Sequence, residues 1–435
     1  MQSIANFPTY ESYKDSGIEW LGNIPSHWQT KPGLVAFSEN KRDNKGMKED
    51  TVLSLSYGRI VIKPVEKLVG LVPESFETYQ IVEPDDIIIR CTDLQNDKVS
   101  LRTGLAKNKG IITSAYLNLK VREAFDSRFL HYYLHSLDTT KVLYKFGSGL
   151  RQNLSYVDFK RLPVFDIQID IQEAIAKFLD QKTAQVDEAI AIKEKQIKLL
   201  QERKQIIIQR AVTQGLDPNV PMKDSGVEWI GQIPEHWEVE RSRWLFKQRR
   251  EKAQKGDEQL TTSQKYGVVP QQWFMEAEGR RVTQVEFNSE ILKHVESNDF
   301  VISMRSFQGG IEYCAFRGCV SSAYVPLIPS KNVYVDFYKY LLKSRRYIEA
   351  LQSTSNLVRD GQALRYENFC MVDLPLVPIE EQVAIAEYLE RELTICDETT
   401  QIMTRQIKQL KEYKSTIINS VVTGKIKVTP DMVEQ

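Results

Sequence analysis

Features that define several large protein classes are missing from this sequence. No apolar run approaches the roughly 18 to 20 residues that a membrane-spanning helix needs. The N-terminus has no basic region followed by an apolar stretch, so we expect neither a signal peptide nor a membrane partner. The five cysteines are odd in number and form no C-x-x-C pair, which disfavours a disulfide framework or a zinc site and is typical of a cytoplasmic protein.

Excess charge of either sign is also absent, because 58 basic residues balance 58 acidic ones. A protein that binds polyanions in bulk is usually basic, so any binding to nucleic acid must rely on local patches. The chain is nevertheless globular in composition, with 42% hydrophobic and 10% aromatic residues. Its 435 residues are enough for two or three domains with cores of their own.

Motifs that mark common enzymes are missing as well. There is no G-x-x-x-x-G-K-[ST] phosphate loop, and no Asn/Asp-Pro-Pro-aromatic tetrapeptide of the kind that amino-methyltransferases use. The glycine-rich stretch 146–149 opens no βαβ unit, so we interpret it as a turn. His131 and His135 lie four residues apart, but HYYLH lacks the glutamate of H-E-x-x-H and no further metal ligand is evident. We therefore expect no metal site and no catalytic residues.

What the sequence does contain is a duplication. KDSGIEWLGNIPSHW at 14–28 recurs as KDSGVEWIGQIPEHW at 223–237, with eleven of fifteen positions identical and an offset of 209 residues. Shorter matches continue along the chain, for example between QEAIA at 172–176 and QVAIA at 382–386. Such internal similarity predicts two copies of one structural unit.

Each copy consists of a globular part and a long segment that follows it. Short β-branched runs bounded by Gly, Pro, Asn and Asp predict strands, and residues 127–146 and 335–352 have helical spacing, so we expect an α+β fold with mixed α/β domains. We predict domain 1 over 1–166, a first long helix over 167–214, domain 2 over 215–377, a second long helix over 378–424, and a C-terminal tail over 425–435.

Both long segments lack glycine and proline, and one heptad frame fits both at an offset of 210 residues. About five heptads with mostly apolar core positions predict a coiled coil, and each helix of about 45 residues would be roughly 65–70 Å long. The alternative is that each helix packs separately on its own globular part. The predicted core residues are Leu179, Val186, Ile190, Ile197, Leu200 and Ile207 in the first helix, and Leu389, Leu393, Cys396, Met403, Ile407, Leu410 and Ile417 in the second.

The repeated KDSG-x-E-W-x-G-x-I-P-x-H-W block and the helix after each globular part resemble the specificity subunit of type I restriction–modification systems over almost the whole chain. The resemblance implies two target-recognition domains alternating with two long helices, which pair as an antiparallel coiled coil with pseudo-two-fold symmetry. Each domain would read one half of a bipartite site in double-stranded DNA. Because the two copies differ in most polar residues, we expect an asymmetric site.

The same resemblance implies partners and cofactors. A specificity subunit is non-catalytic and assembles with two methyltransferase subunits and with restriction subunits that act as motor and nuclease. S-adenosylmethionine, ATP and magnesium would then be bound by those partners and not by this chain. Two other functions compete with this interpretation. One is a self-contained DNA methyltransferase or nuclease, which the missing motifs disfavour, and the other is a coiled-coil scaffold that binds only proteins.

Residues that contact DNA are expected in loops next to aligned strands. Base edges in the major groove are read by Arg, Lys, Gln and Asn, and phosphates are held by Arg, Lys, Ser, Thr and backbone amides. For any single residue, a solvated loop side chain explains the sequence equally well. The candidates are Tyr57, Arg59, Arg90, Thr92, Arg151, Gln152 and Asn153 in the first copy, and Gln264, Tyr266, Gln271, Arg305, Gln308, Arg359 and Gln362 in the second.

The tryptophans of the repeated block need an explanation of their own. Trp20, Trp28, Trp229 and Trp237 stand next to Ile-Pro pairs and look like an apolar clasp. We favour packing of each domain onto a helix end over docking of a partner protein, although one clasp could serve both purposes.

Overall fold

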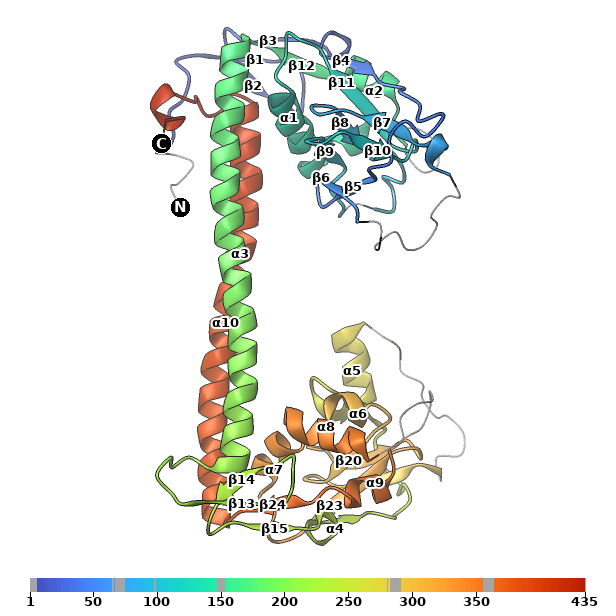
Figure 1. Cartoon of the computed structure of the whole chain (residues 1–435), viewed down its shortest axis with the longest axis vertical. Coiled ribbons are helices and arrows are strands. Elements are labelled where there is room, and N and C mark those ends of the chain that lie inside the picture. Colours follow the sequence, from blue (N-terminus) through green and yellow to red (C-terminus); the bar gives the residue numbers. More distant parts are fainter. Residues whose placement is uncertain are drawn as a thin grey trace. The chain divides into compact units, whose positions relative to one another are not determined.

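The structure is a computed structural model of the whole chain. It describes residues 6–64, 66, 75–97, 99–146, 153–279, 281, 291–354 and 364–434. The chain forms two compact units (Figure 1). The first unit contains Met1–Lys193 and Arg405–Gln435, and the second contains Glu194–Thr404. Each unit therefore holds one globular part and a portion of both long helices, α3 (Ile169–Gln214) and α10 (Ile379–Val422).

A four-stranded antiparallel sheet forms the centre of each globular part. In the first unit the strand order is β4-β11-β8-β9, and in the second it is β16-β23-β20-β21. The two sheets use matching strands of the two copies, so the duplication in the sequence is also a duplication of topology. The strands are β4 (Phe37–Glu39), β11 (Leu117–Val121), β8 (Ile87–Ile89) and β9 (Thr103–Leu105), and β16 (Phe246–Gln248), β23 (Val325–Pro329), β20 (Phe300–Ile302) and β21 (Glu312–Tyr313).

Smaller two-stranded sheets surround each central sheet and also recur in both units. In the first unit the pairs are β1 (Tyr13–Asp15) with β2 (Asn23–Pro25), β3 (Gln29–Pro32) with β12 (Pro163–Asp166), β5 (Leu53–Ser56) with β6 (Arg59–Ile62), and β7 (Gln80–Val82) with β10 (Gly110–Ile112). In the second unit they are β13 (Met222–Asp224) with β14 (Gln232–Pro234), β15 (Glu238–Glu240) with β24 (Leu374–Leu376), β17 (Leu260–Ser263) with β18 (Gly267–Pro270), and β19 (Lys293–Val295) with β22 (Gly318–Val320).

Short helices complete the globular parts. They are α1 (Ser127–Thr139) and α2 (Tyr156–Arg161) in the first unit, and α4 (Ser242–Leu245), α5 (Gln271–Glu278), α6 (Ser306–Gly309), α7 (Val335–Leu341), α8 (Arg345–Ser353) and α9 (Tyr366–Cys370) in the second. The range 127–146, predicted to be helical, contains α1 in the first copy, and the range 335–352 contains α7 and all of α8 except its last residue in the second.

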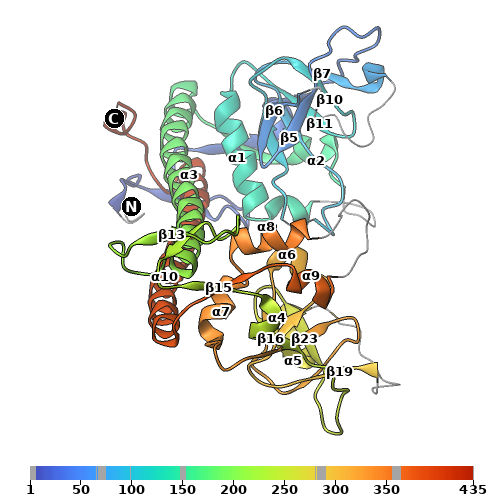
Figure 2. The same ribbon diagram turned by 60° about the horizontal axis from the view of Figure 1, so that its bottom comes forward.

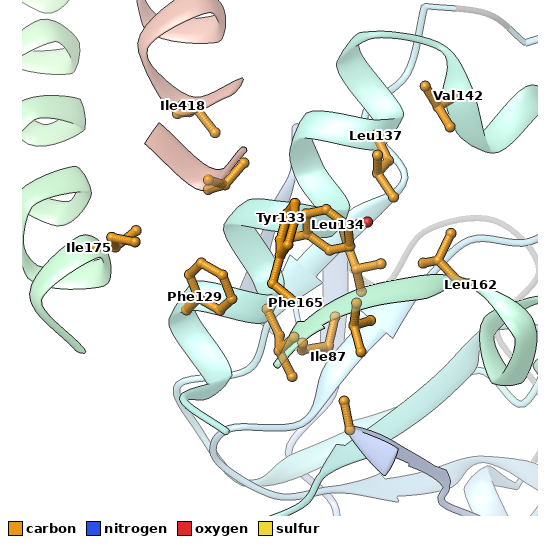
Figure 3. Packing of buried hydrophobic residues seen from close by; sticks show 14 of the residues in the cluster. Ile87, Phe129, Tyr133, Leu134, Leu137, Val142, Leu162, Phe165, Ile175 and Ile418 are labelled. Atoms are coloured by element: carbon orange, nitrogen blue, oxygen red, sulfur yellow. The ribbon is translucent and has the colours of Figure 1, made fainter. Parts of the chain in front are cut away.

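The core of the first unit runs from its sheet through α1 to the long helices. Helix α1 lies between the strands and the helix pair in both overall views (Figures 1 and 2). Its apolar face carries Phe129 and Leu134, which pack with Ile87 of β8 on one side and with Ile175 of α3 and Ile418 of α10 on the other (Figure 3). All five side chains are almost fully buried, so the hydrophobic effect holds both long helices against the globular part.

The long helices pair with each other in an antiparallel sense. Within the first unit, Lys414 Nζ lies 2.7 and 2.8 Å from the two carboxylate oxygens of Asp187, and Lys193 Nζ lies 2.6 Å from Gln406 Oε1. Rising residue numbers on α3 therefore meet falling numbers on α10. Lys193 and Lys414 interrupt the apolar heptad core, and both form polar contacts between the helices that restrict the register in which the helices pair.

None of the thirteen predicted core residues of the coiled coil is exposed. Nine of them are buried, and four (Ile197, Leu200, Ile207 and Met403) are half-buried. The fold class predicted from the sequence is confirmed, since two α/β parts alternate with two closely packed long helices. The alternative of separate packing on each globular part is partly true as well, because the helices also contribute to the domain cores.

The tryptophan clasp holds a helix end in each unit. Trp28 and Trp237 are fully buried. In the first unit, Gly424 follows α10 with a φ of +74°, and a Cβ added there would meet Pro25 Cδ at 2.5 Å. In the second unit, Gly215 follows α3 with the same φ, and its Cβ would lie 3.4 Å from Trp237. Glycine at both positions therefore ends the helix and lets the clasp approach closely.

No helix among the described residues combines the length and apolarity needed to cross a membrane. All five cysteines are free thiols.

Candidate nucleic-acid interface

The hairpin of β5 and β6 presents Tyr57 at its tip. Tyr57 and Gly58 form a two-residue turn in which both residues have positive φ, 49° and 76°, as type I′ hairpin turns require. The side chain of Tyr57 is 95% exposed. Behind the tip, Arg59 Nη2 lies 2.5 Å from Asp187 Oδ2 of α3. Because Asp187 also bonds Lys414 of α10, the hairpin is tied to both long helices.

A second group of candidates surrounds the loop that follows β8. The buried guanidinium of Arg102 donates hydrogen bonds to the carbonyl oxygens of Arg90, Thr92, Asp93 and Asp97, at 3.2, 2.8, 3.1 and 2.5 Å. This network fixes the loop's shape. Arg102 was not among the predicted residues, because no motif in the sequence marks it.

The loop brings Arg90, Thr92 and Asn153 together. Arg90 forms an ion pair with Asp97, and Asn153 Oδ1 accepts a hydrogen bond from the backbone N–H of Asp93 at 2.9 Å. Arg90 and Asn153 therefore have partners inside the protein, and they would have to exchange these partners to contact DNA.

The corresponding hairpin of the second unit, β17 and β18, is built differently. Its loop has three residues, Gln264 to Tyr266. The hydroxyl oxygen of Ser263 accepts hydrogen bonds from the backbone N–H groups of Lys265 and Tyr266, both at 3.3 Å. Tyr266 folds back onto α5, where its hydroxyl lies 3.0 Å from Glu278 Oε1 and its ring meets Trp273 edge-on with centroids 5.1 Å apart. This tyrosine is held in place by its own domain.

Two hollows in the second unit gather most of the candidates of the second copy. A small one of about 210 Å³ is lined by Gln264 and Arg305, and a larger one of about 780 Å³, between the domain and the long helices, is lined by Gln264, Tyr266 and Gln308. Gln271 stands apart, since its side-chain oxygen is buried. The remaining candidates Arg151, Gln152, Arg359 and Gln362 lie outside the described residues.

The two units differ in charge at two equivalent positions near the long helices. His131 and His135 of α1 occupy the places that Lys339 of α7 and Lys343, two residues after α7, take in the second copy. Burial, with the proximity of His135, lowers the pKa of His131 to about 3, and burial lowers that of His135 to about 4, so both are uncharged at neutral pH. Lys343 instead pairs with the buried Glu312 at 2.5 Å. Among the described residues no cluster of three or more His, Cys, Asp or Glu could hold a metal ion.

A buried histidine distinguishes the second domain in another place. His294 on β19 has Nδ1 at 2.7 Å from Asp257 and Nε2 at 2.9 Å from Glu296. Burial alone would lower the pKa of His294, but the hydrogen bonds to the two carboxylates outweigh it and raise the pKa above the ordinary value of 6.5. The first domain has Ile81 at this strand position, in an apolar cluster.

We expect the free energy of unfolding to fall as the pH rises from about 6 through the raised pKa of His294. The charged imidazolium is stabilised by Asp257 and Glu296 in the folded state only, and its deprotonation removes this contribution. This contribution is fully present below the pKa of an unfolded histidine, about 6.5. The variant His294→Gln should lose it, and urea unfolding at about pH 6 and pH 8 measures the difference. His27→Gln, at an exposed histidine, is the control. Equal pH slopes for wild type and His294→Gln would contradict the expectation.

Comparison with solved structures defines the class of fold. The fold is shared with a chain solved in connection with complex assembly and conformational transition of the type I R-M system, with a TM-score of 0.64, 14% identity, and coverage of 92% of this chain and 98% of that one. It is also shared with the HsdS subunit from Thermoanaerobacter tengcongensis, with a TM-score of 0.51, 14% identity, and coverage of 93% and 98%. No family model matches the chain.

Curated relatives narrow the class further. The type I restriction enzyme MjaX specificity subunit of Methanocaldococcus jannaschii is 24% identical over 451 residues, covering 98% of this chain and 100% of that protein. The MjaVIII specificity subunit of the same organism is 25% identical over 335 residues, covering 74% and 75%. The resemblance seen in the sequence is therefore confirmed, since the curated homologues of this chain are type I restriction enzyme specificity subunits.

Proposed function

We propose that this chain is the DNA-specificity subunit of a type I restriction–modification complex, and that it is itself non-catalytic. Each target-recognition domain reads one half of a bipartite site in duplex DNA. The observation that carries the proposal is similarity to a specificity subunit along the full length of both proteins, including both domains and both long helices. A duplicated reader on paired helices is the arrangement that a two-part DNA site requires.

The two half-sites should differ in sequence. The first domain offers a two-residue turn with an exposed tyrosine, whereas the second offers a three-residue turn whose half-buried tyrosine packs against α5. Because direct readout depends on the shape and hydrogen-bonding groups of such loops, the recognised site is asymmetric.

An apolar stripe on the long helices supports the proposed methyltransferase partners. Four large apolar side chains of the second unit, between 52% and 66% exposed, recur at seven-residue spacing, outside the heptad core. They are Leu199 and Ile206 on α3, and Ile395 and Ile402 on α10. All four hold the same heptad position, and in an antiparallel pair one heptad position falls on the same side of both helices. The stripe therefore suits an amphipathic helix of a partner.

The globular parts bond to the long helices through a different heptad position from that of the stripe. Tyr132 donates a hydrogen bond to Asp180 at 2.8 Å in the first unit, and Tyr340 donates one to Glu390 at 2.5 Å in the second. We propose that two methyltransferase subunits dock on the long helices. Restriction subunits join this complex, and S-adenosylmethionine, ATP and magnesium bind to the partner subunits.

Mapping of methylated bases tests the proposal. The chain is expressed with its methyltransferase in cells that lack other modification enzymes, and modified sites are read from the genomic DNA. We expect one bipartite asymmetric motif, and replacement of residues 222–377 by another recognition domain should change one half of it only. Absence of any motif, with no DNA binding by the assembled complex, would favour a protein-only scaffold. Methylation by the chain without a partner would favour a self-contained enzyme.

A further inference from the structure

Tyr57 has a backbone conformation that few side chains tolerate. Its φ of 49° lies in the left-handed region, where β-hairpin turns normally place asparagine, aspartate or glycine. Bulky aromatic residues are outliers there, and strain of this kind clusters at functional sites. The ring gains nothing from its own domain in return, because the residue is 95% exposed. The strained backbone at Tyr57 is therefore not explained by packing of the ring, which points to contact of the ring with a ligand.

The turn is rigidly mounted. Gly58 packs so closely that an added Cβ would lie 3.0 Å from Leu101 Cδ1, and the next residue, Arg59, is bonded to Asp187 of α3. Asp187 in turn accepts two hydrogen bonds from Lys414 of α10. These contacts hold the backbone at the base of the Tyr57 side chain, so the turn itself loses little conformational freedom when the ring meets a ligand.

The second copy uses the same tyrosine in the opposite way. Tyr266 is the last residue of a three-residue loop, lacks a positive φ, and places its ring against Trp273 and its hydroxyl on Glu278. The second domain provides partners for its half-buried tyrosine, whereas the first domain leaves the ring of Tyr57 in solvent. We therefore assign the exposed ring of the first copy to contact with a ligand.

We propose that Tyr57 stacks its ring on a base of the half-site that the first domain binds, at a step where the DNA is partly unstacked. The inference rests on the proposed function and adds a role for one side chain. A two-stranded β-ribbon fits the major groove, which is about 12 Å wide. The residues flanking the turn, Ser56 and Arg59, are polar and cationic, which suits DNA better than the charge-depleted core of a protein interface.

Fluorescence of 2-aminopurine tests the stacking. Duplexes that carry the mapped methylation site are made with 2-aminopurine at each position of one half-site in turn, and titrated with the complex of this chain and its methyltransferase. We expect a change in emission at one position with the wild type and with Tyr57→Phe, and none with Tyr57→Ala. Affinity should fall on the order of 10- to 100-fold for Tyr57→Ala, as for the loss of one stacked base, and little for Tyr57→Phe.

The variant Tyr57→Asn separates binding from folding. Asparagine suits the left-handed turn, so its melting temperature should equal or exceed that of the wild type while DNA affinity falls as in Tyr57→Ala. Trp244→Ala, at a largely exposed aromatic residue of the second domain outside the candidate DNA contacts, is the control and should retain the emission change. Wild-type affinity for Tyr57→Ala, an unchanged emission at every position, or loss of methyltransferase assembly instead of DNA binding would each overturn the inference. Failure of the wild-type complex to bind the duplex would instead count against the proposed function.

Discussion

Replacing Leu199 and Ile402 by glutamate will abolish capture of the methyltransferase subunits and leave the chain folded. Both side chains belong to the apolar stripe and are more than half exposed, so their replacement removes little from the core of the coiled coil. In a complex the same positions would be covered by the partner, and two carboxylates buried in an apolar contact cost far more than the lost apolar area. We expect the affinity for the methyltransferase to fall at least about 100-fold, as for central residues of an interface.

The measurement is affinity of the purified chain for the methyltransferase by calorimetry or surface capture, with thermal melting as the folding check. Lys198→Glu with Lys408→Glu is the control, because both lysines are on the long helices and more than three-quarters exposed but lie at a heptad position outside the stripe. The control double variant changes the net charge of the chain more than the stripe variant does, yet it should still bind the methyltransferase. If both double variants bound equally well, the stripe would not be the docking surface.

The long helices could be predicted from the sequence because a heptad pattern without glycine or proline depends on local periodicity alone. The predicted bounds 167–214 and 378–424 differ by no more than two residues from α3 and α10. The antiparallel sense came from the family resemblance, and the contact of Lys414 with Asp187 could not be derived from spacing. The heptad frame already places the stripe residues outside the core, but only the structure shows that they are exposed.

The candidate DNA contacts were harder to predict, because the same types of polar side chain that bind DNA also form hydrogen bonds and ion pairs within the protein. Arg59 and Arg90 stood out as cations in loops, yet the structure pairs each of them with an aspartate, one of which comes from a helix more than a hundred residues away. Arg102, which determines the shape of the loop after β8, had no pattern to mark it. Conversely, Tyr57 and Tyr266 align in the sequence, and only φ angles and burial separate their roles.

Lengthening the helix pair should lengthen the gap between the two half-sites without changing either of them. Because the helices are antiparallel and Lys193 faces Gln406, one heptad must be added after Lys193 and another after Thr404 to keep the core in register. Seven residues add about 10.5 Å, which is about three base pairs of duplex. Methylation of the original sites should fall to background, and the mapped motif should reappear with the same halves and a spacer about three base pairs longer.

The lengthened chain should also bind its new site more weakly than the wild type binds the original one. Three base pairs rotate the second half-site by roughly 100° around the duplex, whereas a whole heptad leaves the face of the coiled coil unchanged. Three heptads in each helix, about 31.5 Å, come close to one turn of DNA at 34–36 Å and should recover affinity. Exchange of one heptad for another of equal length is the control, and an unchanged spacer in the lengthened variant would show that the helices do not set the distance between the two readers.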